Sequence, residues 1–132
     1  KLAILGFGTT ALAALEAADS VNTEAIDVYD ARFAKPVDGE LVEQLLKNNI
    51  PIITVEDHSI IGGFGSAVIE EANRRNLDAT LITTLGLPDH WISHGSRKEQ
   101  LAEAGIDVAG ISAAALRIFS TNKTESPIVV TK

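Results

Sequence analysis

The stretch that decides the fold is LAILGFGTTALAALEAAD at residues 2–19, an apolar run that passes through a glycine turn into an alanine-rich segment. Four consecutive apolar residues before the first glycine are typical of a strand buried on both faces. Alanine is the strongest helix former, so the second half predicts a helix, capped by Thr9 or Thr10 and with Leu12 and Leu15 on one side. Strand, turn and helix in this order predict the first unit of an α/β domain.

The same alternation continues along the chain. Further strands are predicted at residues 25–30, 50–55 and 79–84, loops at 32–37, 56–65 and 85–95, and a helix at 66–75. Capping residues predict three more helices: one from Asp38 to Asn48-Asn49, one opened by a capping box at Ser96 and Glu99 and ended by Gly105, and one from Asp107 to Phe119. Near-continuous apolar strands between helices predict a three-layer α/β/α fold with a mainly parallel sheet.

Length and charge limit the class of protein. A chain of 132 residues fits one domain, which we expect at residues 1–119, followed by a polar tail at residues 120–132. Within that tail, residues 128–131 either stay disordered or add an edge strand. A net charge of −7 and scattered basic residues argue against nucleic acid, and no apolar run is long enough to cross a membrane. The absence of cysteine favours the cytoplasm.

Two glycine clusters are candidate binding sites. The turn at residues 6–11 matches G-x-G-x-x-A formally, so it is either a dinucleotide-binding turn or a tight strand-to-helix turn. Gly62, Gly63 and Gly65 precede the helix predicted at 66–75. Converging N–H groups there either bind an anion or allow close packing against another domain, and packing is the favoured interpretation.

Three histidines are candidates for chemistry. Glu56, Asp57 and His58 follow the third predicted strand, where parallel sheets gather ligand-binding groups, so they form either an acid–base group or a structural cluster. His90 and His94 have the spacing of zinc ligands on a helix, but the segment around them is predicted to be irregular and no third ligand is evident. Trp91 is expected to be a core or interface anchor. We assign no catalytic, cofactor-binding or metal-binding residue in this chain.

Four motifs resemble the C-terminal domain of the transketolase family. They are VEDHSIIGGFGS at residues 55–66, DARFAKPVD at 30–38, LGLPD at 85–89 with HGS at 94–96, and LAEAGIDVAGI at 101–111. The last two resemble the 1-deoxy-D-xylulose-5-phosphate synthase branch of the family more than transketolase itself. The resemblance implies a fifth, antiparallel strand upstream of Lys1, so that the sheet has four to five strands.

The resemblance also implies what the longer enzymes do. Such enzymes have three domains, and the first two bind thiamine diphosphate and Mg²⁺ and condense pyruvate with glyceraldehyde 3-phosphate, a step towards isoprenoids. The third domain is expected to be inactive alone, to support the homodimer and to close the active site. Its partners are then the N-terminal and central domains and a second subunit. The expected interface residues are Glu56, His58, Gly62, Gly63 and Phe64.

Two alternatives stay open. In the first alternative, the chain is the C-terminal domain of another family member, either a transketolase or the β-subunit of a 2-oxoacid dehydrogenase. The sequence of residues 85–96 argues against this alternative. From a different class, it is a regulatory or adaptor domain that binds an anion at residues 62–66.

Overall fold

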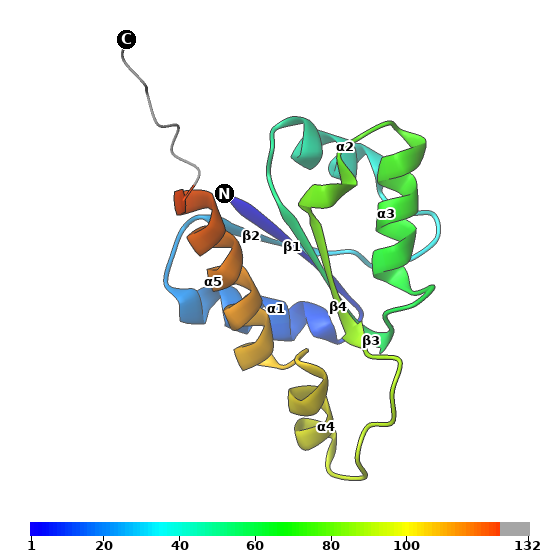
Figure 1. Ribbon diagram of the computed structural model, residues 1–132, viewed down its shortest axis with the longest axis vertical. Helices are drawn as coiled ribbons and strands as arrows, with labels where there is room; N and C mark the ends of the chain where they lie inside the picture. The colour runs from blue at the N-terminus through cyan, green and yellow to red at the C-terminus, as the bar shows by residue number, and fades with distance from the viewer. Residues whose placement is uncertain (125–132) are drawn as a thin grey trace.

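The computed structural model describes residues 1–124 and confirms the α/β fold class. Its strands are β1 (Leu2–Phe7), β2 (Ile26–Asp30), β3 (Ile52–Ser59) and β4 (Ile82–Leu87). Its helices are α1 (Thr10–Val21), α2 (Gly39–Lys47), α3 (Phe64–Arg74), α4 (Arg97–Ala104) and α5 (Val108–Thr124), with a 3-10 turn, η1 (Ala79–Leu81). The strands form one sheet in the order β2-β1-β3-β4, and each neighbouring pair is parallel (Figure 1).

Two helical layers cover the sheet. Helices α1 and α5 lie against one face, and α2 and α3 lie against the other (Figure 1). The central strand β1 shows how the sequence specifies this, because side chains alternate between the faces of a strand. Leu2 and Ile4 belong to the core under α1 and α5, whereas Ala3 and Leu5 belong to the core under α2 and α3. Both faces are buried, so the strand is apolar throughout.

Helix α1 presents a different face to the core than its largest residues suggest. Leu12 and Leu15 are exposed, and the buried side chains are Ala14, Ala17 and Ala18. Small alanine side chains let the helix approach the sheet closely, so they form the inner face and the leucines point to solvent. The helix was predicted to be capped by Thr9 or Thr10. Thr9 stands at the N-cap position but its side chain makes no capping hydrogen bond, and Thr10 is the first residue of α1, with a hydroxyl that bonds to Phe7 and Val55.

The bounds of β3 and β4 differ most from the predicted strands. Strand β3 continues through Glu56 to Ser59, where residues 56–65 were predicted to be a loop. Backbone pairing does not require apolar side chains, and Glu56 lies opposite Phe7 in β1 while Ser59 lies opposite Leu87 in β4. The predicted strand 79–84 begins only at Ile82 and ends at Leu87, because the Asp78 side chain accepts from the backbone N of Thr80 and holds η1 before it.

The capping predictions for α2, α4 and α5 are confirmed. The Asp38 carboxylate accepts from the backbone N of Leu41, and the capping box at Ser96 and Glu99 is complete. Asp107 accepts from the backbone N of Gly110. Helix α5 runs past its predicted end at Phe119 to Thr124. The domain boundary at residue 119 stays a prediction, and the predicted tail segment 128–131 lies outside the described residues.

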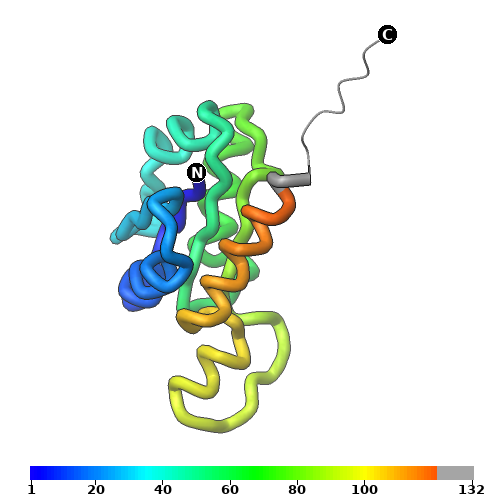
Figure 2. Tube along the Cα trace, turned by 90° about the vertical axis from the view of Figure 1, so that its left-hand side faces the viewer, coloured from blue at the N-terminus to red at the C-terminus, as the bar shows by residue number. Residues whose placement is uncertain are grey.

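Helix α4 and the loop before it stand apart from the three layers. Figures 1 and 2 both show this arm projecting beyond the carboxyl ends of the strands. Arg97, the first residue of α4, ties the arm to the sheet edge: its Nη2 lies 2.6 Å from Asp57 Oδ2 and donates to Thr9 Oγ1. Across residues 1–124, we find no helix that combines the length and the hydropathy needed to span a bilayer.

Candidate functional site

The connections around β1 and β3 create a crevice at the carboxyl edge of the sheet. From β1 the chain passes through α1 on one face to β2, and from β3 it passes through α3 on the opposite face to β4. The carboxyl ends of two neighbouring strands whose connections diverge in this way form the usual ligand-binding crevice of open parallel sheets. Phe7 and Glu56 lie opposite one another at those two ends.

Glu56 is the central residue of this crevice, and it is buried. Its Oε2 accepts from the backbone N of Phe64 at 2.7 Å, and its Oε1 accepts from the backbone N of Gly65 at 2.8 Å. These N–H groups belong to the first turn of α3, where an α-helix has unpaired donors and the positive end of its dipole. A carboxylate from β3 thus satisfies the start of α3 and joins strand to helix.

Two glycines of the cluster, Gly63 and Gly65, are explained by close packing, whereas Gly62 has open space around it and a positive φ of 72°. A methyl group on Gly63 would collide with Glu56 Oε2 and with the backbone O of Ser59. A methyl group on Gly65 would lie 2.6 Å from the side chains of both Thr54 and Thr84. This packing lies inside the domain, so the predicted packing of the cluster against another domain stays a prediction. The N–H groups of Phe64 and Gly65, which the anion interpretation needs, are already bonded to Glu56.

Phe7 and Thr10, which the sequence analysis did not name as site residues, tie the end of β1 to α3 and to β3. The rings of Phe7 and Phe64 stack with centroids 5.1 Å apart. The Thr10 hydroxyl donates to the backbone O of Val55 at 2.7 Å and accepts from the backbone N of Phe7. A threonine directly after a glycine turn was the available signal, but it was interpreted only as a helix cap.

A cavity of about 860 Å³ opens beside the crevice. All five residues expected at an interface line it: Glu56, His58, Gly62, Gly63 and Phe64. They differ in position, since Glu56 and Phe64 are buried in its floor, whereas the His58 side chain is 69% exposed at its edge. His58 Nδ1 lies 3.9 Å from Glu56 Oε2. Their role at an interface stays a prediction.

The proposed acid–base group is only partly assembled. Asp57 points away from His58 and pairs with Arg97, because neighbouring residues of a strand face opposite sides. The carboxylate nearest to His58 is that of Glu56, whose two oxygens are held by backbone N–H groups. The structure therefore brings Glu56 and His58 together and separates Asp57 from them.

The remaining candidate residues do not form a binding or catalytic site within residues 1–124. A methyl group on Gly6 would lie 2.8 Å from the backbone N of Ala11, which explains the glycine turn by tight strand-to-helix packing. His90 and His94 lie outside the helices, in the exposed loop before α4. Among residues 1–124 no three His, Cys, Asp or Glu side chains come together as a metal site.

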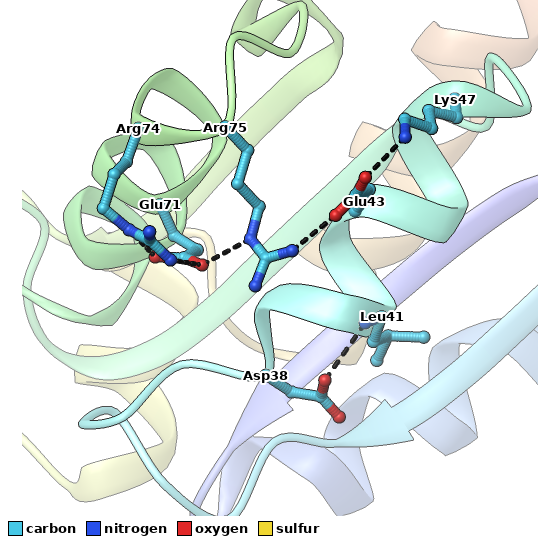
Figure 3. Close-up of polar contacts among 7 residues, drawn as sticks. All are labelled: Asp38, Leu41, Glu43, Lys47, Glu71, Arg74 and Arg75. Carbon is cyan, nitrogen blue, oxygen red and sulfur yellow. Dashed lines mark hydrogen bonds and ion pairs between the residues drawn. The ribbon is translucent and has the colours of Figure 1, made fainter.

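An ion network joins α2 to the end of α3, and three of its members line the cavity: Glu71, Arg74 and Arg75 (Figure 3). Arg75 lies between the two helices and donates to Glu71 of α3 at 2.6 Å and to Glu43 of α2. Arg74 also donates to Glu71, and Lys47 pairs with Glu43. Hydrogen bonds first from Arg74 and then from Arg75 lower the pKa of Glu71 from 4.5 to about 2.

This network predicts a loss of stability in acid. Between pH 4.5 and about 2 the unfolded chain takes up a proton at Glu71 while the folded chain does not, so the free energy of unfolding falls as the pH falls. The Glu71→Gln variant lacks this contribution, so its unfolding free energy should depend less on pH in that window. Urea unfolding at several pH values measures this. The exposed Glu16 on α1 supplies the control Glu16→Gln, which should keep the wild-type slope. If the unfolding free energy of all three proteins depended equally on pH, the lowered pKa of Glu71 would not be the cause of the acid instability.

A second prediction concerns Thr54, which is fully buried below Gly65. Within residues 1–124 its hydroxyl is the buried side-chain oxygen without a hydrogen-bond partner. Thr54→Val removes that unsatisfied group at nearly constant volume and should raise the unfolding free energy by about 1 kcal/mol. Thr10→Val removes a hydroxyl that is bonded to Val55 and should lower it by about 1–2 kcal/mol. Chemical denaturation of both variants measures the difference, and a loss of stability in Thr54→Val would refute the argument.

Most of the chain matches one protein family. Residues 1–111 match the model of the family described as "Transketolase, C-terminal domain". The 1-deoxy-D-xylulose-5-phosphate synthase of Geobacillus sp. (strain WCH70) is 46% identical over 112 residues, which cover 83% of this chain and 18% of that protein. The synthase of the same name from Shewanella amazonensis is 45% identical over 111 residues, 84% of this chain and 17% of that protein.

A solved structure is also similar. The chain described as "Split gene transketolase, inactive beta4 tetramer" superimposes with a TM-score of 0.78 at 27% identity, over 91% of this chain and 39% of that one. The present chain spans less than a fifth of the length of the curated synthases that it matches.

Proposed function

Because this chain belongs to the transketolase C-terminal domain family, we propose that it acts as the C-terminal domain of a 1-deoxy-D-xylulose-5-phosphate synthase. The whole enzyme would condense pyruvate with glyceraldehyde 3-phosphate and release CO₂, in the cytoplasm and on the route to isoprenoids. The observation that carries the proposal is 46% identity to a synthase of that name along 83% of this chain. Identity to the transketolase-type structure is lower, at 27%, which favours the synthase over the transketolase alternative.

Within the part of the chain that the structure describes, the residues do not fit thiamine diphosphate or Mg²⁺. No His, Cys, Asp or Glu triplet within residues 1–124 is placed to bind a metal. The N–H groups at the start of α3, the donors that a diphosphate would need at the crevice, are bonded to Glu56. We therefore assign both groups to the rest of the enzyme and derive no step of the reaction from this chain. The same bonds argue against a regulatory anion site at residues 62–66.

The role proposed for this domain is to support the homodimer and to close the active site formed by the other domains. The cavity at the carboxyl edge supports this role, because Gly62 and His58 present surface there. The other three expected interface residues, Glu56, Gly63 and Phe64, would act indirectly. They set the start of α3 and the path of the loop that carries Gly62, so they would position the interface rather than contact it.

A domain exchange tests the proposed function. The matching segment of the Geobacillus synthase is replaced by this chain, and formation of 1-deoxy-D-xylulose 5-phosphate from pyruvate and glyceraldehyde 3-phosphate is measured. We expect a dimer with turnover within about tenfold of the parent enzyme. The control replaces the matching segment of a transketolase by this chain. That chimera should have little transketolase activity. A folded chimera no more active than a synthase that lacks the segment would refute the proposal.

A further inference from the structure

Helix α4 and the loop before it, residues 88–104, are bonded to each other, and we call this body the arm. The backbone N of Ser93 in the loop donates to Glu103 Oε1 of the helix at 3.2 Å, and Gln100 of the helix donates to the backbone O of Ser93 at 3.3 Å. A complete capping box closes the turn between loop and helix. These bonds lie within the arm, so it can keep its shape without support from the sheet.

One face of α4 attaches the arm to the three layers. No residue of α4 is buried, but Leu101 and Ala104 pack at the margin of the core under α1 and α5. Arg97 Nη2 lies 2.6 Å from Asp57 Oδ2 at the end of β3, and it donates to Thr9 Oγ1 before α1 at 3.3 Å. Residues 97, 101 and 104 are spaced by four and three positions, so they share this face of the helix.

The C-terminal end of α4 is fixed by packing. Gly105 ends the helix with a φ of 69°, and Ile106 directly after it is buried. Helix α5 approaches so closely that a methyl group on Gly110 would collide with the backbone O of Gly105. Glycine at a positive φ tolerates backbone rotation that other residues resist. The chain is therefore anchored from Gly105 onward, and this glycine can serve as a pivot for the helix before it.

The N-terminal end of α4 is held by polar contacts instead. The side chains of Arg97 and Asp57 are 62% and 26% exposed, and such partly exposed ion pairs contribute little free energy and are screened by salt. Strand β4, which leads into the loop, is fixed up to Leu87, because the backbone O of Leu87 accepts from the backbone N of Ile60. Between its two anchored ends, the arm is therefore held by the packing of the second half of α4 and by one weak polar latch at Arg97.

We propose that the arm swings about Gly105 between the latched position of the structure and a released position, and that the Arg97–Asp57 ion pair is the latch. Asp57 directly follows Glu56 in β3, so the latch lies beside the crevice. Release would uncover the Asp57 carboxylate and the Thr9 hydroxyl on the α1 side of that crevice. All of these contacts lie within the present chain, so the latch is independent of the proposed function.

Distances between spin labels test the latch on the full chain, which contains no cysteine that would take up a label elsewhere. Lys98→Cys on α4 with Glu16→Cys on α1 reports the arm, and Glu16→Cys with Glu70→Cys on α3 reports the layers alone; all three positions are exposed. Arg97→Glu replaces attraction to Asp57 by repulsion, so the fraction of molecules with a second distance between the arm labels should rise about tenfold. The distance within the layers should not change.

Two further variants separate the ion pair from other causes. The charge swap Asp57→Lys with Arg97→Glu should restore the single arm distance, and Arg117→Glu at an exposed position of α5 should leave it unchanged. Hydrogen exchange of the α4 amides should stay at the wild-type rate in Arg97→Glu, because the helix moves without unfolding. An unchanged arm distance in Arg97→Glu overturns the latch, as does a swap that restores nothing. A second distance accompanied by fast exchange in α4 also overturns it, because the helix would then unfold rather than swing.

Discussion

Replacing Glu56 by glutamine should lower the free energy of unfolding by about 3 kcal/mol. The carboxylate oxygens of Glu56 each accept a backbone N–H from the first turn of α3, in a fully buried position. Glutamine has nearly the same shape but carries one acceptor and one NH₂ group. That group would face a backbone donor, so one N–H of α3 would stay buried and unpaired. The negative charge that balances the helix dipole would also be lost.

The matched control is Glu70→Gln, an exposed glutamate on the same helix. It changes the charge of the chain equally and should alter stability by less than about 0.5 kcal/mol. Urea denaturation of the two variants and the wild type gives both values. If Glu56→Gln unfolds at the same urea concentration as Glu70→Gln, the carboxylate does not anchor α3, and the structural account of the crevice fails.

Replacing Gly63 by alanine is the second large effect that we expect, a loss of about 3 kcal/mol. The added methyl group meets Glu56 Oε2 on one side and the backbone O of Ser59 on the other. A flexible side chain could move aside, but Glu56 is tied to α3 and the second obstacle is main chain. The strand and the start of the helix would have to separate, which also disturbs the cavity.

Gly95→Ala is the control for this substitution. The nearest atom to a methyl group there is Glu99 Oε2, the end of a flexible side chain, at 3.0 Å, and Glu99 Cβ lies at an ordinary contact distance of 3.5 Å, so the cost should stay below about 1 kcal/mol. The double variant Glu56→Ala with Gly63→Ala should lose less stability than the sum of the two single variants, because the first change removes one of the two obstacles. Strict additivity in denaturation experiments would show that Gly63 and Glu56 do not contact.

Predictions from local sequence were the most accurate. Asp38 and the Ser96–Glu99 box were assigned correctly because a cap involves groups three residues apart. Alternation of apolar strands and helices was enough to predict the three layers. The inner face of α1 was not predictable from residue size, because the distance between helix and sheet decides whether alanine or leucine faces the core.

The candidate site was predicted as a segment but not as an arrangement. The motif around Glu56 and Gly63 pointed to the right part of the chain, yet a glutamate after an apolar run resembles the start of a loop. Its burial depends on N–H groups eight and nine residues later, and no periodicity reports such a contact. Trp91 was predicted to lie in the core or at an interface. The core alternative is wrong, because its side chain is 98% exposed, and the interface alternative stays a prediction. The exposure of Phe33 and Ile61 was not predicted, because it follows from the path of the loops.

The parallel pairing of β1 affects how the chain folds. Ala3 of β1 is in register with Ile52 of β3, and no pair of strands in this sheet can be closed by a hairpin. The chain between β1 and β3 loses conformational entropy before the contacts between these two strands can form. Domains with such long-range strand pairing fold slowly. During synthesis β1, α1 and β2 leave the ribosome while β3 is still being made. One edge of the buried apolar strand Leu2–Phe7 therefore stays open until β3 arrives, and over that interval the nascent chain is most exposed to aggregation.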